Sequence, residues 1–295
     1  MPTVNTQMQG KICMITGANS GIGKATALGL AQMGATVVLV SRDRARGEEA
    51  QNEIKAKSGN DAIDLLLADL SSQQSIRQLV EDFKQRYTRL HVLINNAGVF
   101  ALTWRETVDG LEMSFAVNVL APFLLTNLLL DVIKASAPAR IVNVSSNQQE
   151  ANHLKLDDLQ LEKSYRPMRA YAQSKLAVVL FTYELARRLE GTGVTANCLH
   201  PGFVATNIAQ RDLVLPARLA TKLIFRFGTS PEKGAKTSLY LATSLDVEGV
   251  TGKYFEKSVP RKSTPLSYDE SLQQQLWKVC AQLTGLTNEA IQSTK

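Results

Sequence analysis

Short apolar runs alternate with amphipathic stretches along most of the chain. The first two runs, 11–16 and 35–40, are rich in Val, Ile and Leu, and a helical pattern over 22–33 lies between them. A strand–helix–strand unit of about 30 residues has the length that a parallel crossover needs. Continuous runs of branched apolar residues are typical of strands that helices cover on both faces.

The alternation continues towards the C-terminal part of the sequence. Predicted strands cover 11–16, 35–40, 62–67, 90–95, 140–145, 194–199 and 252–255. Predicted helices cover 22–33, 44–57, 71–87, 111–135, 170–189 and 231–243. We therefore predict an α/β fold, a Rossmann-type doubly wound parallel sheet of about seven strands with helices on both faces. No linker interrupts the pattern, so we expect residues 1–295 to form a single domain, with a core over about 11–257 and a helical extension over about 266–285.

Charge and apolar content limit the classes of partner. The chain has 33 Lys and Arg against 27 Asp and Glu, a net charge of +6, and no basic arm of the kind that binds nucleic acid. The polar residues 1–10 predict neither a signal peptide nor an anchor. The most apolar stretch, 115–133, predicts a buried helix and no membrane span, because four residues interrupt it: Asn118, Pro122, Asn127 and Asp131.

Cysteine and histidine are sparse. Cys13, Cys198 and Cys280 lie far apart in apolar stretches, which predicts buried thiols in a reducing compartment and hence a cytoplasmic protein. The spacing of the cysteines suggests no metal site, so no metal is predicted. The histidines do not form a spacing cluster either, and each is more often structural than chemical: His91, His153 and His200.

A glycine-rich turn, TGANSGIG over 16–23, lies between the first predicted strand and the first predicted helix. Gly17 permits a tight turn, Gly21 lets the backbone approach a pyrophosphate, and Gly23 permits close packing of helix on strand. The helix N-terminus then presents free N–H groups to the phosphates. Glycines are common in turns of any kind, but the strand–turn–helix context favours a dinucleotide site.

The end of the second strand indicates which dinucleotide binds. An acidic residue there would hold an adenosine ribose hydroxyl and repel a 2′-phosphate. Ser41 stands at that place and Arg42 follows it, and a guanidinium is well suited to a phosphate. Asp43 could bind the ribose, but it is better explained as the cap of the helix that starts near Arg44. NADP(H) is therefore favoured over NAD(H).

Tyr171 and Lys175 are four residues apart at the start of a predicted helix, so they share one face. A neighbouring ammonium favours the phenolate, and the tyrosine can then protonate a carbonyl oxygen or deprotonate an alcohol. Ser145 and Ser146 end a predicted strand, where a hydroxyl can hydrogen-bond the substrate oxygen. Each feature alone has an ordinary structural explanation, as a helix surface or a strand end.

Four motifs in order resemble the short-chain dehydrogenase/reductase family: TGxxxGxG at 16–23, NNAG at 95–98, YxxxK at 171–175 and PGxxxT at 201–206. The resemblance runs from about Lys11 to Gly285. Ser146 and Tyr171 are 25 residues apart, farther than in compact members of the family. That gap and the C-terminal residues are similar to the retinol-dehydrogenase-like and WW-domain-oxidoreductase-like branch: 252–255, 276–277 and 283–285.

The resemblance implies four catalytic residues and a set of cofactor contacts. Tyr171 would be the general acid/base, Lys175 would lower its pKa and hold the ribose, Ser146 would orient the substrate oxygen, and Asn118 would hold a water in a proton relay with Lys175. Asp69 and Leu70 would contact the adenine, and Val204 and Thr206 the nicotinamide amide. The expected cofactor contacts are Gly17, Asn19, Ser20, Gly21, Ile22, Gly23, Ser41, Arg42, Asp69, Leu70, Asn96, Ala97, Gly98, Tyr171, Lys175, Pro201, Gly202, Val204 and Thr206.

The leading hypothesis is an NADP(H)-dependent oxidoreductase that interconverts a carbonyl and its alcohol, with a small-molecule substrate and, as in relatives, a homodimer or homotetramer. An apolar substrate is indicated by several residues that ordinary core packing also explains: Phe100, Leu102, Trp104, Phe203 and 213–227. The segment 207–230 is predicted as a substrate lid, with a partner-contacting helix as the alternative. Two other functions stay open: an NADP(H)-binding sensor or scaffold without turnover, and a nucleotide-sugar epimerase or dehydratase.

Overall fold

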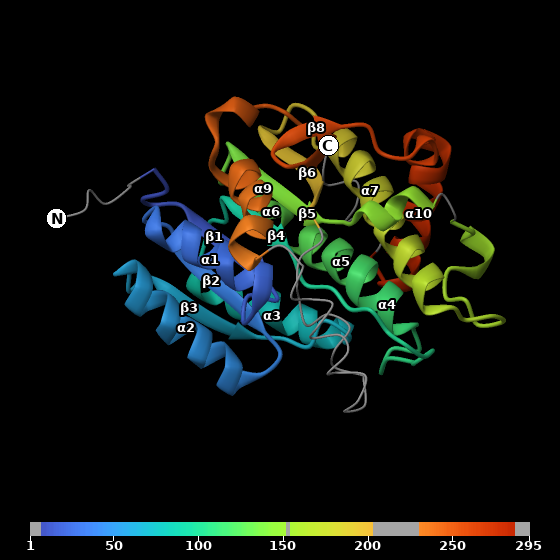
Figure 1. Ribbon diagram of the computed structural model, residues 1–295, viewed down its shortest axis with the longest axis horizontal. Coiled ribbons are helices and arrows are strands. Elements are labelled where there is room, and N and C mark those ends of the chain that lie inside the picture. The colour runs from blue at the N-terminus through green and yellow to red at the C-terminus, as the bar shows by residue number, and fades with distance from the viewer. Residues whose placement is uncertain (1–6, 152–153, 203–229, 287–295) are drawn as a thin grey trace.

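A computed structural model of the chain describes residues 7–151, 154–202 and 230–286 (Figure 1). Its strands are β1 (Ile12–Thr16), β2 (Thr36–Ser41), β3 (Ile63–Leu67), β4 (Val92–Asn95), β5 (Ala139–Val144), β6 (Val194–His200), β7 (Tyr254–Glu256) and β8 (Val259–Arg261). In the part of the chain described, these strands form one sheet in the order β3-β2-β1-β4-β5-β6-β7-β8. All neighbours pair parallel except β7 and β8, which pair antiparallel. The predicted doubly wound α/β fold is confirmed.

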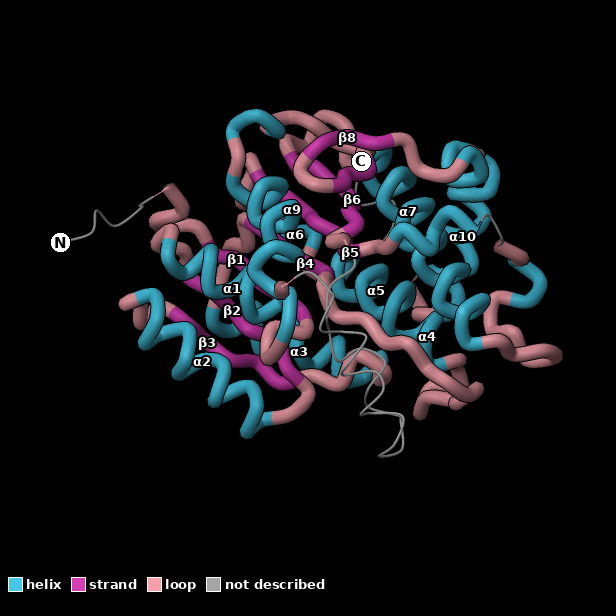
Figure 2. Tube along the Cα trace, viewed as in Figure 1, coloured by secondary structure: helices cyan, strands magenta, loops and turns pink. Residues whose placement is uncertain are grey.

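Helices cover both faces of the sheet (Figure 2). One face packs on α1 (Gly21–Gln32), α2 (Arg44–Ser58) and α9 (Pro231–Thr243), and the other on α3 (Gln73–Arg86), α5 (Ala121–Leu128), α7 (Pro167–Arg188) and α10 (Glu270–Leu283). Side chains of β1 alternate between these layers: Cys13 and Ile15 lie in the first, and Met14 lies in the second. Both faces are dry, which is why the strands appear in the sequence as continuous apolar runs.

The eighth strand was not predicted. β8 is three residues long, exposed, and joined to β7 by the two-residue turn of Lys257 and Ser258. Both turn residues have positive φ angles, 50° and 62°. Such hairpin turns are usually signalled by glycine or asparagine, and neither residue is present at this turn. An exposed antiparallel edge strand of this length leaves no apolar pattern in the sequence.

The helix predicted over 111–135 is continuous in the sequence pattern but broken in the structure. It consists of α4 (Met113–Phe115), the π-helical turn η1 (Ala116–Leu120), α5 and α6 (Leu130–Lys134). Pro122, in the first turn of α5, has no N–H and cannot form a regular helical bond back to the carbonyl of Asn118. Single π-helical turns within α-helices are frequent at functional sites. The break falls at one of the expected catalytic residues.

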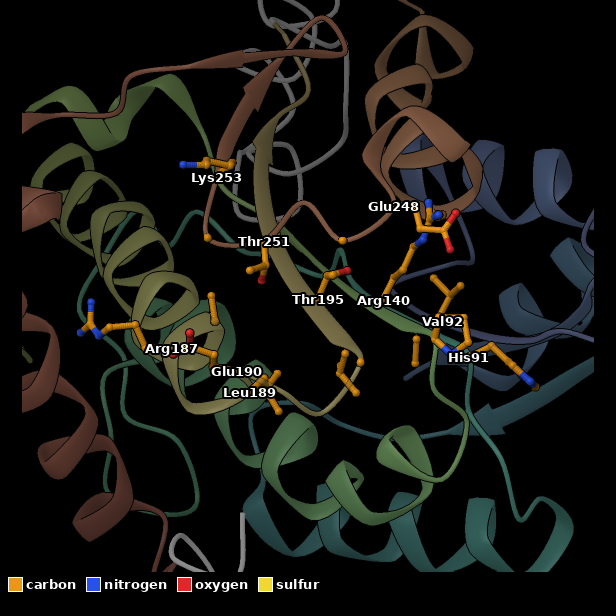
Figure 3. A pocket seen from close by; sticks show the side chains of 18 of the residues that line it. His91, Val92, Arg140, Arg187, Leu189, Glu190, Thr195, Glu248, Thr251 and Lys253 are labelled. Atoms are coloured by element: carbon orange, nitrogen blue, oxygen red, sulfur yellow. The ribbon is translucent and has the colours of Figure 1, made fainter. Parts of the chain in front are cut away.

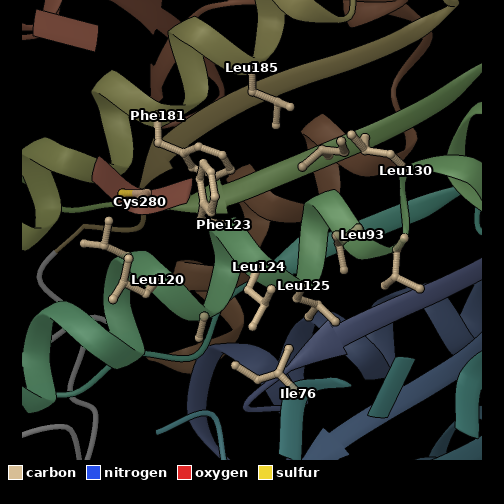
Figure 4. Packing of buried hydrophobic residues seen from close by; sticks show 14 of the residues in the cluster. Ile76, Leu93, Leu120, Phe123, Leu124, Leu125, Leu130, Phe181, Leu185 and Cys280 are labelled. Carbon is tan, nitrogen blue, oxygen red and sulfur yellow. The ribbon is translucent and has the colours of Figure 1, made fainter. Parts of the chain in front are cut away.

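The C-terminal helix α10 is fixed to the main body by an aromatic cluster. The Trp277 ring lies 4.8 Å from that of Phe123 on α5, edge to face, and 5.7 Å from that of Phe181 on α7. Figure 4 shows Phe123 of α5 and Phe181 of α7 packed with Cys280, which lies on α10 like Trp277. Together with the short turn η5 (Pro265–Tyr268), α10 accounts for the predicted helical extension.

We expect Trp277→Ala to lower the free energy of unfolding by about 3–5 kcal/mol, because it leaves a cavity against two rings. Trp277 is 3% exposed. Leu245→Ala is the control, since Leu245 is 75% exposed and its truncation removes little buried area. Urea denaturation followed by circular dichroism measures both. Equal stability losses in the two variants would contradict the anchoring role of α10.

Candidate active site

The site lies where the order of strands reverses. From β1 the chain crosses to β2 on one side, and from β4 it crosses to β5 on the other. Adjacent strands with diverging connections leave a crevice beyond their carboxyl ends, the usual ligand position in open α/β sheets. Thr16 ends β1 and Asn95 ends β4, so the glycine-rich turn and the NNAG segment face each other across this crevice.

The glycine-rich turn has no room for a side chain at Gly23. A Cβ on Gly23 would lie 2.4 Å from the Gly17 carbonyl oxygen and 2.5 Å from Asn96 Nδ2. Gly17 and Gly21 have φ angles of +66° and +55°, which glycine adopts without strain. Glycine therefore allows the tight turn at 17 and 21, and at 23 it allows α1 to pack closely on the end of β1 and on Asn96.

Helix α1 starts directly from this turn. Ser20 is its N-cap residue, and in the described structure its side chain forms no capping hydrogen bond. The amides of the first turn, which include those of Ile22 and Gly23, are of the kind that bind an anion at a helix N-terminus. Asn19 lies half-buried next to Ser20. Five of the expected cofactor contacts, residues 19–23, therefore lie together at the N-terminus of α1. Gly17 lies between them and the end of β1.

The NNAG segment is tied to the turn through Thr16. Thr16 Oγ1 accepts hydrogen bonds from the backbone N–H groups of Asn96 and Ala97, both at 3.0 Å. Asn96 Nδ2 donates to the Thr16 carbonyl at 2.8 Å. Gly98 follows, half-buried, and leads into the loop that approaches Tyr171. These bonds fix the distance between the ends of β1 and β4.

The residues expected at the adenosine end lie at the ends of β2 and β3. Asp43 accepts from the Arg46 N–H at 3.1 Å and so caps α2, as predicted. Ser41 Oγ donates to the Asp43 carbonyl at 2.9 Å. The Arg42 guanidinium is mostly exposed and lies 4.0 Å from the Asp69 carboxylate, with Leu70 next in the chain. Arg42 is therefore a mostly exposed cation at the end of β2.

Tyr171 and Ser146 meet at the carboxyl end of β5. Ser146 is 8% exposed and accepts from the Gln148 N–H at 3.2 Å. Burial raises the pKa of Tyr171, and its hydrogen bond with Ser146 acts in the opposite direction. The ring of Phe100 packs edge-on against the Tyr171 ring, with 5.4 Å between centroids. Tyr171 lies in the second turn of α7, which begins three residues before the predicted start.

Lys175 lies one turn further along α7 and is 3% exposed. Its Nζ donates to the Val144 carbonyl at 2.9 Å and lies 5.6 Å from the Tyr171 ring centroid. No salt bridge to Lys175 forms among the described residues, and burial lowers its pKa to about 8. A buried cation without a counter-ion favours negative charge nearby, on the phenol or on a ligand.

Asn118 lies on the π-helical turn, 2% exposed, and both ends of its side-chain amide are engaged. Oδ1 accepts from the Val99 N–H at 2.8 Å, and Nδ2 donates to the Val99 carbonyl at 3.0 Å and to Ser174 Oγ at 2.9 Å. The amide thus joins the loop after β4 to α7. Because the side chain is engaged in this way, the expected relay with Lys175 would use the backbone carbonyl of Asn118.

The segment after β6 is described only in part. Pro201 and Gly202 lie half-buried at the strand end, and Gly202 has a φ of +87°. His200, 9% exposed, precedes them, and burial lowers its pKa. Several expectations lie outside the described residues: Val204, Thr206, Phe203, His153, 213–227 and most of 207–230.

A groove of about 950 Å³ opens at the opposite end of the sheet, where the strands begin (Figure 3). None of the expected site residues lines it. His91 there accepts from the Ile12 N–H at 3.0 Å, and Arg140 donates to the Leu241 carbonyl at 3.1 Å. These side chains hold the sheet together, so we assign no chemistry to this end.

Three residues near the site were not identified as parts of it: Glu112, Gln160 and Tyr165. Glu112 is 2% exposed and accepts from the Ser114 and Phe115 N–H groups. The signal in the sequence was a charged residue inside an apolar stretch, which a pattern alone does not connect to a tyrosine more than 50 residues away.

Fold and crevice define a nucleotide-binding α/β oxidoreductase. A family model described as short chain dehydrogenase matches residues 11–213. The chain is 46% identical over 291 residues to retinol dehydrogenase 14 of Mus musculus, covering 95% of this chain and 87% of that protein. It is 43% identical over 283 residues to polyprenol dehydrogenase of Homo sapiens, covering 94% and 86%. The chain belongs to the short-chain dehydrogenase/reductase family, in its retinol-dehydrogenase-like branch, and is an oxidoreductase acting on CH–OH donors.

Solved structures agree with this assignment. An uncharacterised protein from Mycobacterium paratuberculosis matches with a TM-score of 0.76 and 32% identity, over 94% of each chain. An RhlG/NADP active-site complex from Pseudomonas aeruginosa matches with a TM-score of 0.68 and 26% identity, over 85% of this chain and 96% of that one.

Three further findings concern metals, membranes and thiols. Within the described ranges, no helix is both long and apolar enough to cross a membrane. No cluster of three or more His, Cys, Asp or Glu in those ranges is arranged to hold a metal ion. The three cysteines are buried, as predicted, and burial raises the pKa of Cys13 and Cys198 to about 12.

We expect Gly23→Ala to weaken binding of a nicotinamide dinucleotide at least tenfold and to cost about 1–3 kcal/mol of stability, because its Cβ meets backbone. Gly29→Ala on the same helix is the matched control, since its Cβ meets only the flexible end of Leu239, 2.7 Å away. Calorimetric titration and thermal melting measure the two effects. Equal affinities in the two variants would contradict the assignment of this turn.

Proposed function

We propose that the protein interconverts an apolar aldehyde or ketone and its alcohol with NADP(H), using Tyr171 as the general acid/base. The observation that carries the proposal is the convergence of Tyr171, Ser146 and buried Lys175 at the carboxyl end of β5, in a fold whose glycine-rich turn leads from β1 into the N-terminus of α1. When bound, the reduced nicotinamide supplies the hydride. The side chains bind, orient and protonate.

Proton transfer falls to the phenol. In reduction, the Tyr171 hydroxyl would give its proton to the substrate oxygen while Ser146 hydrogen-bonds the same oxygen. In oxidation, the phenolate would take the alcohol proton. Burial opposes the phenolate, whereas the hydrogen bond with Ser146 favours it. The positive charge of Lys175, 5.6 Å from the ring centroid, also favours it.

A route for replacing that proton runs along the helix containing Asn118. The side chain of Asn118 is occupied by Val99 and Ser174, so the relay would use its backbone carbonyl. Pro122 cannot give that carbonyl the amide hydrogen that a regular helix supplies. A water bound there would connect the site towards Lys175, whose pKa of about 8 allows it to exchange protons near neutral pH.

The preference for NADP(H) over NAD(H) rests on Arg42. Its guanidinium is the cation at the end of β2, where an acidic residue would favour NAD(H). Asp43 is engaged as the cap of α2 and does not compete for a ribose hydroxyl. The similarity to an RhlG/NADP complex supports the same choice.

An apolar substrate is supported by the aromatic and apolar residues near Tyr171 and by the relatives. Phe100 forms a wall against Tyr171, and the exposed apolar residues Trp104 and Met168 belong to the two segments next to it. Two relatives, a retinol dehydrogenase and a polyprenol dehydrogenase, are named for long apolar alcohols. We therefore place the substrate among apolar aldehydes, ketones and alcohols.

We expect Tyr171→Phe to lower kcat by about 10²–10⁴-fold while the dissociation constant for NADPH stays within about twofold. Tyr183→Phe is the control, because Tyr183 lies on the same helix but its hydroxyl bonds Ser263, away from the crevice. NADPH oxidation with an apolar aldehyde measures turnover. Full activity of Tyr171→Phe would refute its role as general acid.

We expect Arg42→Ala to weaken NADPH about 10–100-fold and to leave NADH nearly unchanged, as loss of one charge-assisted contact would do. Arg44→Ala is the matched control, since Arg44 is equally exposed and pairs with Glu48 on the outside of α2. Fluorescence titration with both cofactors measures the ratio. A parallel loss for NADPH and NADH would show that Arg42 does not recognise the 2′-phosphate.

A further inference from the structure

We propose that Glu112 and Tyr165, here called the clamp, position the substrate-facing wall Phe100 and the turn of Asn118 against Tyr171. Tyr165 belongs to the segment between Ser146 and Tyr171, so the clamp would make the position of the Tyr171 hydroxyl depend on how that segment packs. This inference rests on the proposed function, because it assigns how that site orients its substrate. Neither member would touch the substrate, so both are positioning residues.

The carboxylate of Glu112 is the fixed point of the clamp. It is 2% exposed, and its two oxygens accept from the Ser114 N–H at 2.8 Å and the Phe115 N–H at 2.7 Å. A buried carboxylate is costly unless hydrogen-bonded, so its position is tightly determined by these donors. Asn118 follows Phe115 by three residues, so the carboxylate sets where the π-helical turn begins.

Tyr165 brings the insertion to the same point. Its hydroxyl donates to the Ala101 carbonyl at 2.8 Å and lies 3.4 Å from Glu112 Oε1. Burial raises the pKa of Tyr165 to about 12, so the phenol keeps its proton and remains a donor. Gln160 adds a second link, since its Oε1 accepts from the Glu112 N–H at 2.8 Å.

These contacts hold Phe100 from both sides. Val99, before it, is bound through both backbone groups by the Asn118 amide, and Ala101, after it, is bound by Tyr165. Between these two fixed positions the Phe100 ring meets the Tyr171 ring at 63°. The wall next to the phenol is thus held by one residue of the expected catalytic set and one residue of the insertion.

The test is Tyr165→Phe, which removes one hydroxyl and keeps the ring. We expect kcat/KM for a long apolar aldehyde to fall about tenfold with a raised KM, because the wall is displaced by a fraction of an ångström. The number of NADPH-binding sites per protein molecule, measured by titration, should be the same in Tyr165→Phe as in the wild type. Tyr87→Phe is the matched control: Tyr87 is also half-buried, and its hydroxyl donates to Asp64 of β3.

Hydrogen–deuterium exchange supplies a readout that does not need turnover. Tyr165→Phe should speed exchange at 99–101, and Glu112→Gln should speed it at 114–118, relative to Tyr87→Phe. If Tyr165→Phe matches Tyr87→Phe in either KM or exchange, the clamp is refuted. If Tyr165→Phe does not fold, Glu112→Gln decides on the same two measurements. A wild-type protein that turns over no carbonyl or alcohol would refute the proposed function, while exchange would still decide on the clamp.

Discussion

The close approach of the first strand end, the glycine turn and the fourth strand end is the constraint on which the site depends. Gly23 has no space for a Cβ because the Gly17 carbonyl and the Asn96 amide already occupy it. Thr16 holds both sides at hydrogen-bond distance. This contact fixes the helix N-terminus and the edge of the crevice in one rigid unit. The ends of the neighbouring strands are placed relative to that unit by the register of the parallel sheet, and Asn118 joins the loop after β4 to α7.

The second feature that organises the site is a buried positive charge. Lys175 is held by a neutral carbonyl of β5, and no acidic residue pairs with it among the residues that the structure describes. That arrangement is unfavourable for the isolated protein and favourable once a phenolate or an anionic ligand is near. Burial in the fold thus lowers the pKa of Lys175. Its positive charge lies close to the phenol, where negative charge develops in the proposed reaction.

Much of this could be predicted from the sequence, because strand and helix periods, glycine turns and helix caps are local signals. The alternation of strands and helices, the position of the glycine-rich turn and the cap at Asp43 follow from such signals. Pro122 was a local signal that the long helix is interrupted, but the contacts of the Asn118 amide with Val99 could not be predicted, since they join residues in two different elements. Strand β8 and the pairing of Glu112 with Tyr165 depend likewise on contacts made only after folding.

In the proposed reaction, hydride passes directly between the nicotinamide and a carbonyl carbon next to Tyr171. The most direct measurement uses NADPH deuterated at its transferable ring position, an apolar aldehyde and mass spectrometry of the product. We expect an alcohol that carries one deuterium on the carbinol carbon for each NADPH oxidised. A cofactor that keeps its deuterium while the substrate is unchanged or isomerised would rule out direct hydride transfer.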